Sequence, residues 1–249
     1  MYKEYEVGRT PNPDVMCNKF IKFGVWLDKI KELGFDKIAT GHYAKTDGKK
    51  LLQAKDDNKD QTYFLHQLSQ DQLNYALFPL GEYGKDKVRE LANKFDLPTA
   101  NKEESMGICF VGEVSMKDFL QDKVRVKKGE IFTSAGEKIG GHDGLAFYTV
   151  GQRQGLDQAG GDKPLFVVDK DFENNRLIVG YEDDLLLYKN EAQVEDIHWI
   201  GQEPKFPLKC KVRLRHRQEL KDCSVDGDKV MFKNKERAVT PGQFAVFYK

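Results

Sequence analysis

Two side chains near the amino terminus, Asp14 and Cys17, have types suited to proton transfer and nucleophilic attack. Asn12 is a good helix N-cap and Pro13 suits the first helical position, so the sequence predicts a helix that begins at Pro13. Residues three apart on a helix share a face, with Cβ atoms about 5–6 Å apart. The positive helix end would lower the pKa of the Cys17 thiol, whereas a nearby carboxylate would raise it unless that carboxylate accepts the thiol proton.

The same two residues have an ordinary structural interpretation. An Asp in a first helical turn interacts favourably with the helix dipole, and a single Cys near a helix is commonly a small buried hydrophobe. Two later features favour the catalytic interpretation: a basic strand near the C-terminus and a second thiol, Cys109. Cys109 lies in SMGICFVG, residues 105–112, where glycines on both sides predict a loop or short strand that can approach a ligand closely. The alternative for Cys109, between Ile108 and Phe110, is a core position in a strand.

Composition limits the class of protein. The 249 residues include 40 Lys+Arg and 40 Asp+Glu, and this zero net charge argues against non-specific DNA coating and for local patches. With 39% hydrophobic and 11% aromatic residues the chain is globular, and no apolar run is long enough to span a membrane. The cysteines form no CxxC pair, so no zinc ribbon is predicted, and a reducing cytoplasm is the expected location. The four cysteines are Cys17, Cys109, Cys210 and Cys223.

The elements around the first thiol form part of an α/β unit. A helix over residues 18–33, ended by Gly34, is followed by an apolar strand over 35–40 that leads to Gly41. In such sheets ligands bind outside the carboxyl ends of the strands. Because a parallel sheet needs more strands than this stretch supplies, we expect that an amino-terminal part of the domain is missing. The helical spacing predicts four inward-facing residues, Phe20, Phe23, Leu27 and Ile30.

Further elements follow in order. Residues 44–54 predict a hairpin with a two-residue type I′ turn at Asp47-Gly48. Asp60 is placed to cap a short helix, and another helix is predicted over 85–95. From about residue 123 the sequence changes to short alternating runs with frequent Gly, Asp and Asn, which is typical of β structure.

The sequence therefore predicts a fold of class α/β plus β, in three domains. Residues 1–115 form a partial α/β catalytic domain, 116–188 a small, mostly β central domain with a hairpin joined through 173–175, and 189–249 a C-terminal antiparallel β-barrel.

One strand of the last domain is strongly basic. In KCKVRLRHR, period-two alternation places five basic residues on one face of a strand. Like charges in that arrangement favour an anionic partner such as a nucleic-acid backbone; the alternative is a solvated face with acidic residues on the neighbouring strand. The five residues are Lys209, Lys211, Arg213, Arg215 and Arg217.

Seven segments, in order along the whole chain, resemble the tRNA-specific 2-thiouridylase family. They are NPDVMCN, GHYA, KDQTYFL, SMGICFVG, VGQRQGL, RLRHRQ and TPGQFAVFY. One departure is large: the family opens with an S-G-G-x-D-S-type phosphate loop of the ATP-pyrophosphatase type, and no such segment is present here. We therefore expect a thiouridylase that lacks its amino-terminal third and is inactive alone.

The resemblance implies an activity and a set of residues. ATP, with Mg²⁺, would adenylate the 2-carbonyl oxygen of the wobble uridine of tRNA, and sulfur would then replace that oxygen. Cys109 would carry the sulfur as a persulfide supplied by a cysteine desulfurase or a sulfur relay protein. Cys17 would be the nucleophile that frees it, with a transient disulfide to Cys109, and Asp14 the acid/base group. Gly41 matches a contact to ATP.

The resemblance also implies which residues lie near tRNA, the first two of them beside the target base. These residues are Asn12, Pro13, Asp14, His42, Lys59, Asp60, Gln61, Arg215, His216 and Gln243.

Two other functions remain open from the sequence. The chain could be a tRNA-binding remnant that keeps the basic C-terminal domain and has lost turnover with its phosphate loop. It could also be another ATP-pyrophosphatase relative, such as a ligase or amidase, which would need neither Cys17 nor Cys109.

Overall fold

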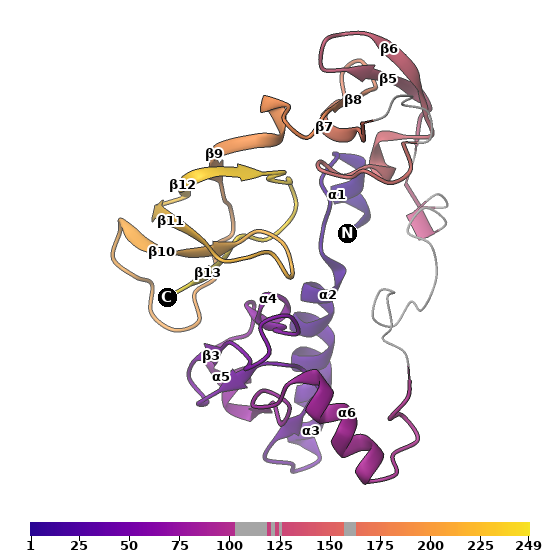
Figure 1. The fold of residues 1–249 in the computed structure, drawn as a ribbon. Coiled ribbons are helices and arrows are strands. Elements are labelled where there is room, and N and C mark those ends of the chain that lie inside the picture. Colours follow the sequence, from indigo (N-terminus) through magenta and orange to yellow (C-terminus); the bar gives the residue numbers. More distant parts are fainter. Residues whose placement is uncertain (103–118, 121–122, 125, 157–162) are drawn as a thin grey trace.

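A computed structural model describes residues 1–102, 119–120, 123–124, 126–156 and 163–249. Three parts follow one another along the chain (Figure 1): an amino-terminal α/β region, a central four-stranded sheet and a C-terminal five-stranded sheet. This order confirms the predicted class, α/β followed by β. No helix within the described ranges is long and apolar enough to cross a membrane.

The long amino-terminal helix begins where the sequence predicts. The backbone of Asn12 is extended, and its Oδ1 accepts a hydrogen bond of 3.3 Å from the N–H of Val15, so Asn12 is the N-cap and Pro13 takes the first helical position. Gly34, at φ +78°, follows the end of the helix, as predicted. The helix consists of α2 (Pro13–Met16), the π-helical η1 (Cys17–Val25) and α3 (Trp26–Glu32), and a separate short helix α1 (Tyr2–Glu6) precedes it.

One face of the long helix packs into the core of the α/β region. Phe23 and Leu27 are each 1% exposed and Ile30 packs beside them, as their spacing predicts. Burying each of the first two contributes roughly 1.5–3 kcal/mol. The prediction for Phe20 is wrong, because its side chain is 58% exposed. The wider π turns of η1, with a kink at Gly24, change the phase of the helix, so the 3.6-residue spacing does not extend back to Phe20.

The other elements of the α/β region are short. The parallel pair of β1 and β4 is the expected α/β arrangement, but only two residues of the predicted strand 35–40 find a partner, and Phe35 remains 61% exposed. The elements are β1 (Ile38–Ala39), β2 (Lys45–Thr46), β3 (Leu51–Leu52), α4 (Thr62–Leu65), α5 (Gln70–Tyr75), β4 (Ala76–Leu77) and α6 (Lys85–Lys94).

The predicted hairpin forms between β2 and β3, but its turn is not the two-residue type I′ turn. Thr46 pairs with Leu51, so the four residues 47–50 form the loop. The Asp47 carboxylate accounts for the difference, because its Oδ1 accepts hydrogen bonds of 2.8 and 2.7 Å from the backbone N–H groups two and three residues further on. This local bonding stabilises the longer loop.

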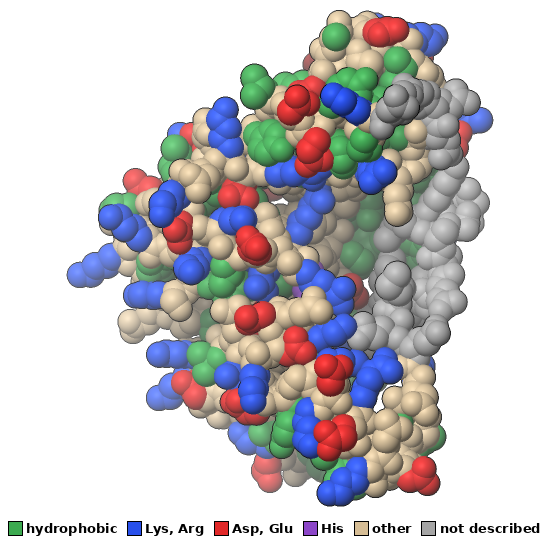
Figure 2. All heavy atoms as spheres, viewed as in Figure 1, with side chains coloured by type: hydrophobic (Ala, Val, Ile, Leu, Met, Phe, Trp, Pro, Cys, Tyr) green, Lys and Arg blue, Asp and Glu red, His purple; other side chains and the backbone are tan. Residues whose placement is uncertain are grey.

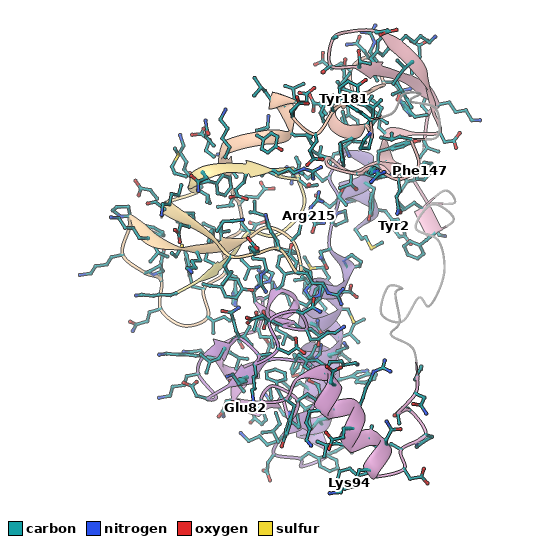
Figure 3. The ribbon with its side chains drawn as sticks, viewed as in Figure 1. Tyr2, Glu82, Lys94, Phe147, Tyr181 and Arg215 are labelled. Carbon is teal, nitrogen blue, oxygen red and sulfur yellow. The ribbon has the colours of Figure 1, made fainter. Side chains whose placement is uncertain are left out.

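The central sheet has the strand order β6-β5-β8-β7, with β5 and β8 parallel and the other pairs antiparallel. The predicted hairpin through 173–175 is confirmed as the β7–β8 pair. Helix α1 packs against this part of the protein, and Figure 3 shows Tyr2 beside Phe147. The elements are β5 (Gly129–Thr133), β6 (Lys138–His142), the 3₁₀ helix η2 (Leu145–Phe147), β7 (Phe166–Asp171) and β8 (Arg176–Gly180).

The C-terminal sheet is antiparallel, in the order β13-β10-β11-β12-β9. Among the described residues the two outer strands do not pair with each other, so the antiparallel β character is confirmed without a closed ring of strands. Val212, Val225 and Val230 form the centre of its core and are fully buried. The elements are η3 (Leu185–Leu187), β9 (Tyr188–Gln193), β10 (Leu208–Arg213), β11 (Lys221–Asp226), β12 (Lys229–Arg237) and β13 (Val246–Tyr248).

The predicted basic strand is wrong in its second half. Strand β10 ends at Arg213, and the backbone has turned by Arg217, which has φ +66°. Lys209 and Lys211 are exposed, but Arg213 is only 5% exposed because the α/β region covers it. Five basic residues therefore do not share one face. On the face shown in Figure 2, Lys and Arg side chains lie among Asp and Glu rather than in one patch.

Candidate functional site

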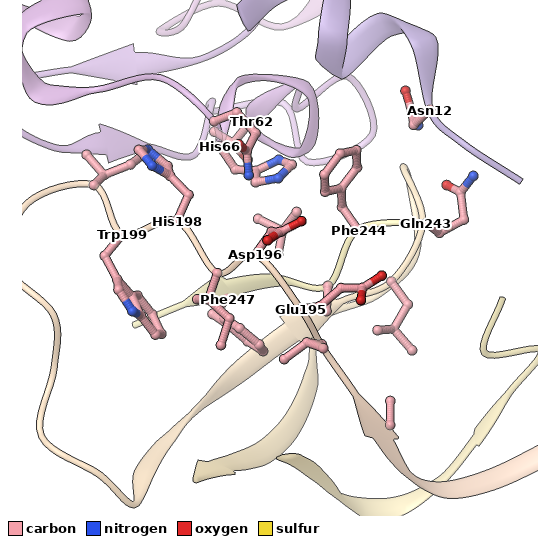
Figure 4. Close-up of a pocket in the computed structure, with 18 of the residues that line it drawn as sticks. Asn12, Thr62, His66, Glu195, Asp196, His198, Trp199, Gln243, Phe244 and Phe247 are labelled. Carbon is pink, nitrogen blue, oxygen red and sulfur yellow. The ribbon is translucent and has the colours of Figure 1, made fainter. Parts of the chain in front are cut away.

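A cleft of about 2050 Å³ separates the start of the long helix from the C-terminal sheet. Asn12, Pro13, Cys17, Gln243 and Phe244 are among the residues that line it. Figure 4 shows Asn12, Gln243 and Phe244 at this cleft. The structure thus brings to one cleft the two positions predicted beside the target base, Asn12 and Pro13, and the predicted nucleophile, Cys17. Gln243, from the far end of the chain, lines the same cleft.

Cys17 occupies the junction between α2 and η1. It is half-buried, and its backbone N–H donates to the carbonyl groups of Pro13 and Asp14. Asp14, one turn earlier, is also half-buried. The predicted shared face therefore exists in helical geometry. Cys109 lies outside the described residues, so its approach to Cys17 stays a prediction.

Asp60 does not cap a helix, contrary to the sequence prediction. Its carboxylate is buried and accepts hydrogen bonds from the Ala54 N–H at 3.1 Å, from Thr62 Oγ1 at 2.7 Å and from Arg213 Nη1 at 2.7 Å. The side chains of Asp60 and Arg213 are 0% and 6% exposed. A buried carboxylate requires a charged partner and several donors, and this requirement outweighs capping. Asp60 therefore has no exposed atoms with which to reach tRNA directly.

The next residue of the same motif joins two segments predicted near tRNA. Gln61 Oε1 accepts a 2.9 Å bond from the Tyr43 N–H, and the Gln61 N–H donates to the Tyr43 carbonyl at 2.8 Å. Tyr43 directly follows His42, so the GHYA and KDQTYFL segments lie side by side. Lys59 is half-buried.

Arg215 and His216 follow β10, where the chain leaves the sheet. Arg215 Nη2 donates to the Val150 carbonyl and to Thr240 Oγ1, both at 2.6 Å, and Figure 3 shows Arg215 where the C-terminal sheet faces the amino-terminal segment. The His216 ring lies 4.4 Å from the Phe64 ring, measured between centroids. Burial, followed by the charge of nearby arginines, lowers the pKa of His216 to about 4, so its ring is neutral near pH 7.

Gly41 and His42 lie at the carboxyl end of β1, where an α/β sheet would bind a nucleotide. Gly41 is exposed, and a Cβ added there would meet only Leu80 Cδ1, at 4.0 Å. His42 is 8% exposed, its Nδ1 lies 2.8 Å from Thr40 Oγ1, and burial lowers its pKa to about 4.

These groups do not fit ATP by themselves. One open glycine at a strand end offers a backbone approach, whereas a triphosphate needs several N–H groups at a helix N-terminus or in a loop. Within the described ranges no group of three His, Cys, Asp or Glu side chains could hold a metal ion. We derive no step through ATP from this part of the chain.

Models of three protein families match the chain in consecutive stretches. They are a tRNA methyl transferase HUP domain over residues 1–113, a tRNA methyl transferase PRC-barrel domain over 117–181 and an aminomethyltransferase beta-barrel domain over 189–249. The tRNA-specific 2-thiouridylase MnmA of Vesicomyosocius okutanii is 46% identical over 259 residues, which cover 99% of this chain and 72% of the relative. The protein of the same name from Francisella philomiragia is 48% identical over 262 residues, covering 98% and 73%.

The chain belongs to the tRNA-specific 2-thiouridylase family.

For a 2-thiouridylase, the most informative residue that the sequence analysis missed is His66. It lines the cleft, its ring meets Phe244 edge-on with centroids 4.7 Å apart, and its Nδ1 lies 2.8 Å from the Tyr63 carbonyl. Burial lowers the pKa of His66 to about 4. In the sequence, only the position of His66 directly after KDQTYFL could have indicated a role at the site, because no spacing rule connects His66 to Cys17.

A second missed feature is a pair of thiols in the C-terminal sheet. Cys210 and Cys223 are direct cross-strand partners, with Sγ atoms 3.5 Å apart. The hydrogen bond between them lowers the pKa of Cys210 and raises that of Cys223. Both are free, and the sequence analysis treated all four cysteines as scattered because partners 13 positions apart on adjacent strands leave no motif.

Proposed function

We propose that this chain carries out the sulfur-transfer chemistry of tRNA 2-thiouridylation, with Cys17 as the nucleophile at the cleft. Family membership supports the reaction. The observation that supports the site most directly is the placement of Cys17 beside Asn12 and Pro13 at the wall of a cleft large enough for a flipped nucleotide. The substrates proposed are tRNA, ATP with Mg²⁺, and persulfide sulfur from a cysteine desulfurase or a relay protein.

The proposed chemistry uses two thiols. Cys109 carries a persulfide, and the thiolate of Cys17 attacks the sulfur attached to the Cys109 side chain. A Cys17–Cys109 disulfide forms, and the outer sulfur leaves with the electron pair of the broken S–S bond to attack C2 of the uridine. Asp14, one helical turn before Cys17, accepts the thiol proton. ATP, which the described residues of this chain do not hold by themselves, would supply the activation that lets the C2 oxygen leave with AMP.

We divide the positions proposed near tRNA into three groups. Asn12 and Pro13, which line the cleft, are proposed to lie beside the base, and Asp14 is proposed as the acid/base group one turn before Cys17. Hydrogen bonds within the protein engage polar atoms of Asp60, Arg215 and Gln243. We therefore propose that these three residues stabilise the arrangement of the site. The remaining positions proposed near tRNA are His42, Lys59, Gln61 and His216.

We propose that the chain is divided into three domains, residues 1–115, 116–188 and 189–249.

The test measures 2-thiouridine in tRNA by mass spectrometry, with ATP, Mg²⁺ and a persulfide-loaded desulfurase. It uses this chain alone and this chain mixed with the part of a relative that lies outside the match. We expect product only in the mixture, loss of product with Cys17→Ser, and retention with the matched control Cys210→Ser. Full activity of Cys17→Ser would overturn the proposal, and turnover by the chain alone would show that its own residues hold ATP.

The two other functions make different predictions in the same assay. A tRNA-binding remnant would bind tRNA in both samples and form product in neither. A ligase or amidase would release pyrophosphate from ATP with an amine or acid substrate, and Cys17→Ser would leave that release unchanged.

A further inference from the structure

The segment that leads into the nucleophile helix is held by a loop from the far end of the chain. The Thr10 N–H donates to the Pro241 carbonyl at 2.9 Å, and Gln243 Nε2 donates to the Thr10 carbonyl at 2.7 Å. Thr10 and Gln243 are 233 positions apart in the sequence. Both backbone groups of one residue, two before the Asn12 cap, are thus bonded by a single loop.

From this arrangement we propose that residues 240–243, here called the clamp loop, position the Asn12–Cys17 segment for reaction, and that Gln243 is a positioning residue. The proposal deepens the proposed function and rests on it for the role of Cys17. In this proposal Gln243 positions the segment and does not contact tRNA, because its Oε1 and its Nε2 both form hydrogen bonds within the protein.

The second end of that amide is anchored in the α/β region. Tyr63 OH lies 3.3 Å from Gln243 Oε1 and 3.2 Å from the carbonyl oxygens of Leu214 and Phe244. Tyr63 is fully buried. The single Tyr63 hydroxyl proton is shared among these three acceptors, and its donation to Oε1 together with the Nε2 bond to the Thr10 carbonyl favours the amide orientation with Nε2 toward Thr10.

Gly242 shows how closely the two segments approach. Its φ is +90°, and a Cβ there would lie 2.7 Å from Thr10 N and 2.8 Å from Arg9 Cβ. Both the backbone conformation and the contact therefore require glycine. A side chain at this position would push the Thr10 segment away from the clamp loop.

The other end of the clamp loop is fixed to the loop that precedes β7 in the central part of the protein. Thr240 Oγ1 accepts the 2.6 Å bond from Arg215 Nη2, and the same nitrogen bonds the Val150 carbonyl. Thr149, next in the chain, places its Oγ1 3.1 Å from Thr10 Oγ1. All three parts of the protein therefore meet at Thr10.

A second attachment lies on the other side of Cys17. Asn18 is 3% exposed, and its Nδ2 donates to the Phe64 carbonyl at 3.3 Å. Cys17 is thus held between Thr10, which depends on the clamp loop, and Asn18, which depends on α4. Since Tyr63 and Phe64 are adjacent, both attachments depend on the same turn of α4.

The test compares Gly242→Ala with Gly227→Ala. Gly227, in the turn between β11 and β12, also has positive φ, at +59°. A Cβ there meets nothing within 4 Å, so Gly227→Ala introduces the backbone strain without displacing a neighbour. The readout is the rate of Cys17 alkylation by iodoacetamide, resolved by peptide mass spectrometry, which needs no turnover. We expect an increase of about fivefold or more for Gly242→Ala, because a loosened segment exposes the half-buried thiol, and no increase for Gly227→Ala.

Two further measurements keep the result interpretable. Gln243→Ala removes both amide contacts without strain and should also accelerate Cys17 alkylation, while the dependence of tRNA affinity on salt stays unchanged, since no phosphate contact is lost. Equal Cys17 alkylation in Gly242→Ala, Gln243→Ala and the unaltered chain would overturn the clamp. Thiolation that survives Cys17→Ser would overturn the proposed function and leave the clamp result standing.

Discussion

Asp60 Oδ2 and Arg213 Nη1 lie 2.7 Å apart in the interior, although 153 positions of sequence separate the two residues. The pair joins the KDQTYFL segment to the end of β10, and the Arg213 guanidinium also lies over the Tyr248 ring at 5.3 Å. One cost remains visible, since Arg213 Nε has no hydrogen-bond partner among the described residues. The pair therefore fixes how the α/β region and the C-terminal sheet meet, at a considerable desolvation cost.

Removing either partner of this pair should be strongly destabilising, and the effects of the two removals should not add. Asp60→Asn or Arg213→Met alone should lower the free energy of unfolding by about 3–5 kcal/mol, because a buried charge is left alone, and the double variant should lose less than the sum. Urea unfolding measures this. Lys233→Ala, which breaks the exposed pair with Asp222, is the control and should change stability by less than about 1 kcal/mol. Strictly additive losses would show that the two side chains are not coupled.

The corrected position of the basic residues changes which ones should govern the salt dependence of tRNA binding. Lys209 and Lys211 are exposed on β10, so alanine at either should reduce the slope of log affinity against log salt by roughly one unit if it contacts a phosphate. Arg213→Ala should weaken binding through stability and leave the slope unchanged. Lys94→Ala, on α6, serves as the control. Identical slopes for all four proteins would place the phosphate contacts elsewhere.

Acid should destabilise the protein through its buried histidines. Burial lowers the pKa of His42 and of His66 from 6.5 to about 4, so between these values the unfolded chain binds more protons than the folded one. The contribution of these histidines to the free energy of unfolding should then fall as pH drops from about 6.5 to about 4 and be nearly constant above 7. Urea unfolding at pH 7 and pH 5 tests this, and His42→Gln should flatten the dependence. A stability that rises on acidification would contradict the burial of these rings.

Mild oxidation should produce two separate disulfides. Cys210 and Cys223 need little movement, since their Sγ atoms are already 3.5 Å apart. Cys17 and Cys109 should also link if they share a site. Peptide mapping after oxidation identifies the partners. A bond from Cys17 or Cys109 to either thiol of the C-terminal sheet would contradict the two-thiol mechanism.

Features that depend on near neighbours were predictable from the sequence. The Asn12 cap, the end of the long helix at Gly34 and the β7–β8 hairpin all follow from contacts within a few residues. The β2–β3 turn is an exception among these local features. The sequence predicted a two-residue turn, and the hydrogen bonds to the Asp47 side chain favour the four-residue loop instead.

Features that depend on distant partners were not predictable in the same way. Asp60 looked like a helix cap and Arg213 like an exposed phosphate ligand because each sequence environment is polar. Only the fold shows that they neutralise each other. Alternation identified the faces of β10 correctly but could not show where the strand ends or which part of its face is covered. Cys109, the second thiol of the prediction, lies outside the described residues.

The most direct test of the site asks where the target base lies when tRNA is bound. A tRNA carrying 4-thiouridine at the wobble position is irradiated on this chain, and the cross-linked peptide is identified by mass spectrometry, which requires neither ATP nor turnover. We predict a cross-link within residues 11–19, at the wall of the cleft that carries Asn12, Pro13 and Cys17. Cross-links confined to the central sheet or to the outer face of β9–β12 would contradict the assignment of Cys17 as the nucleophile.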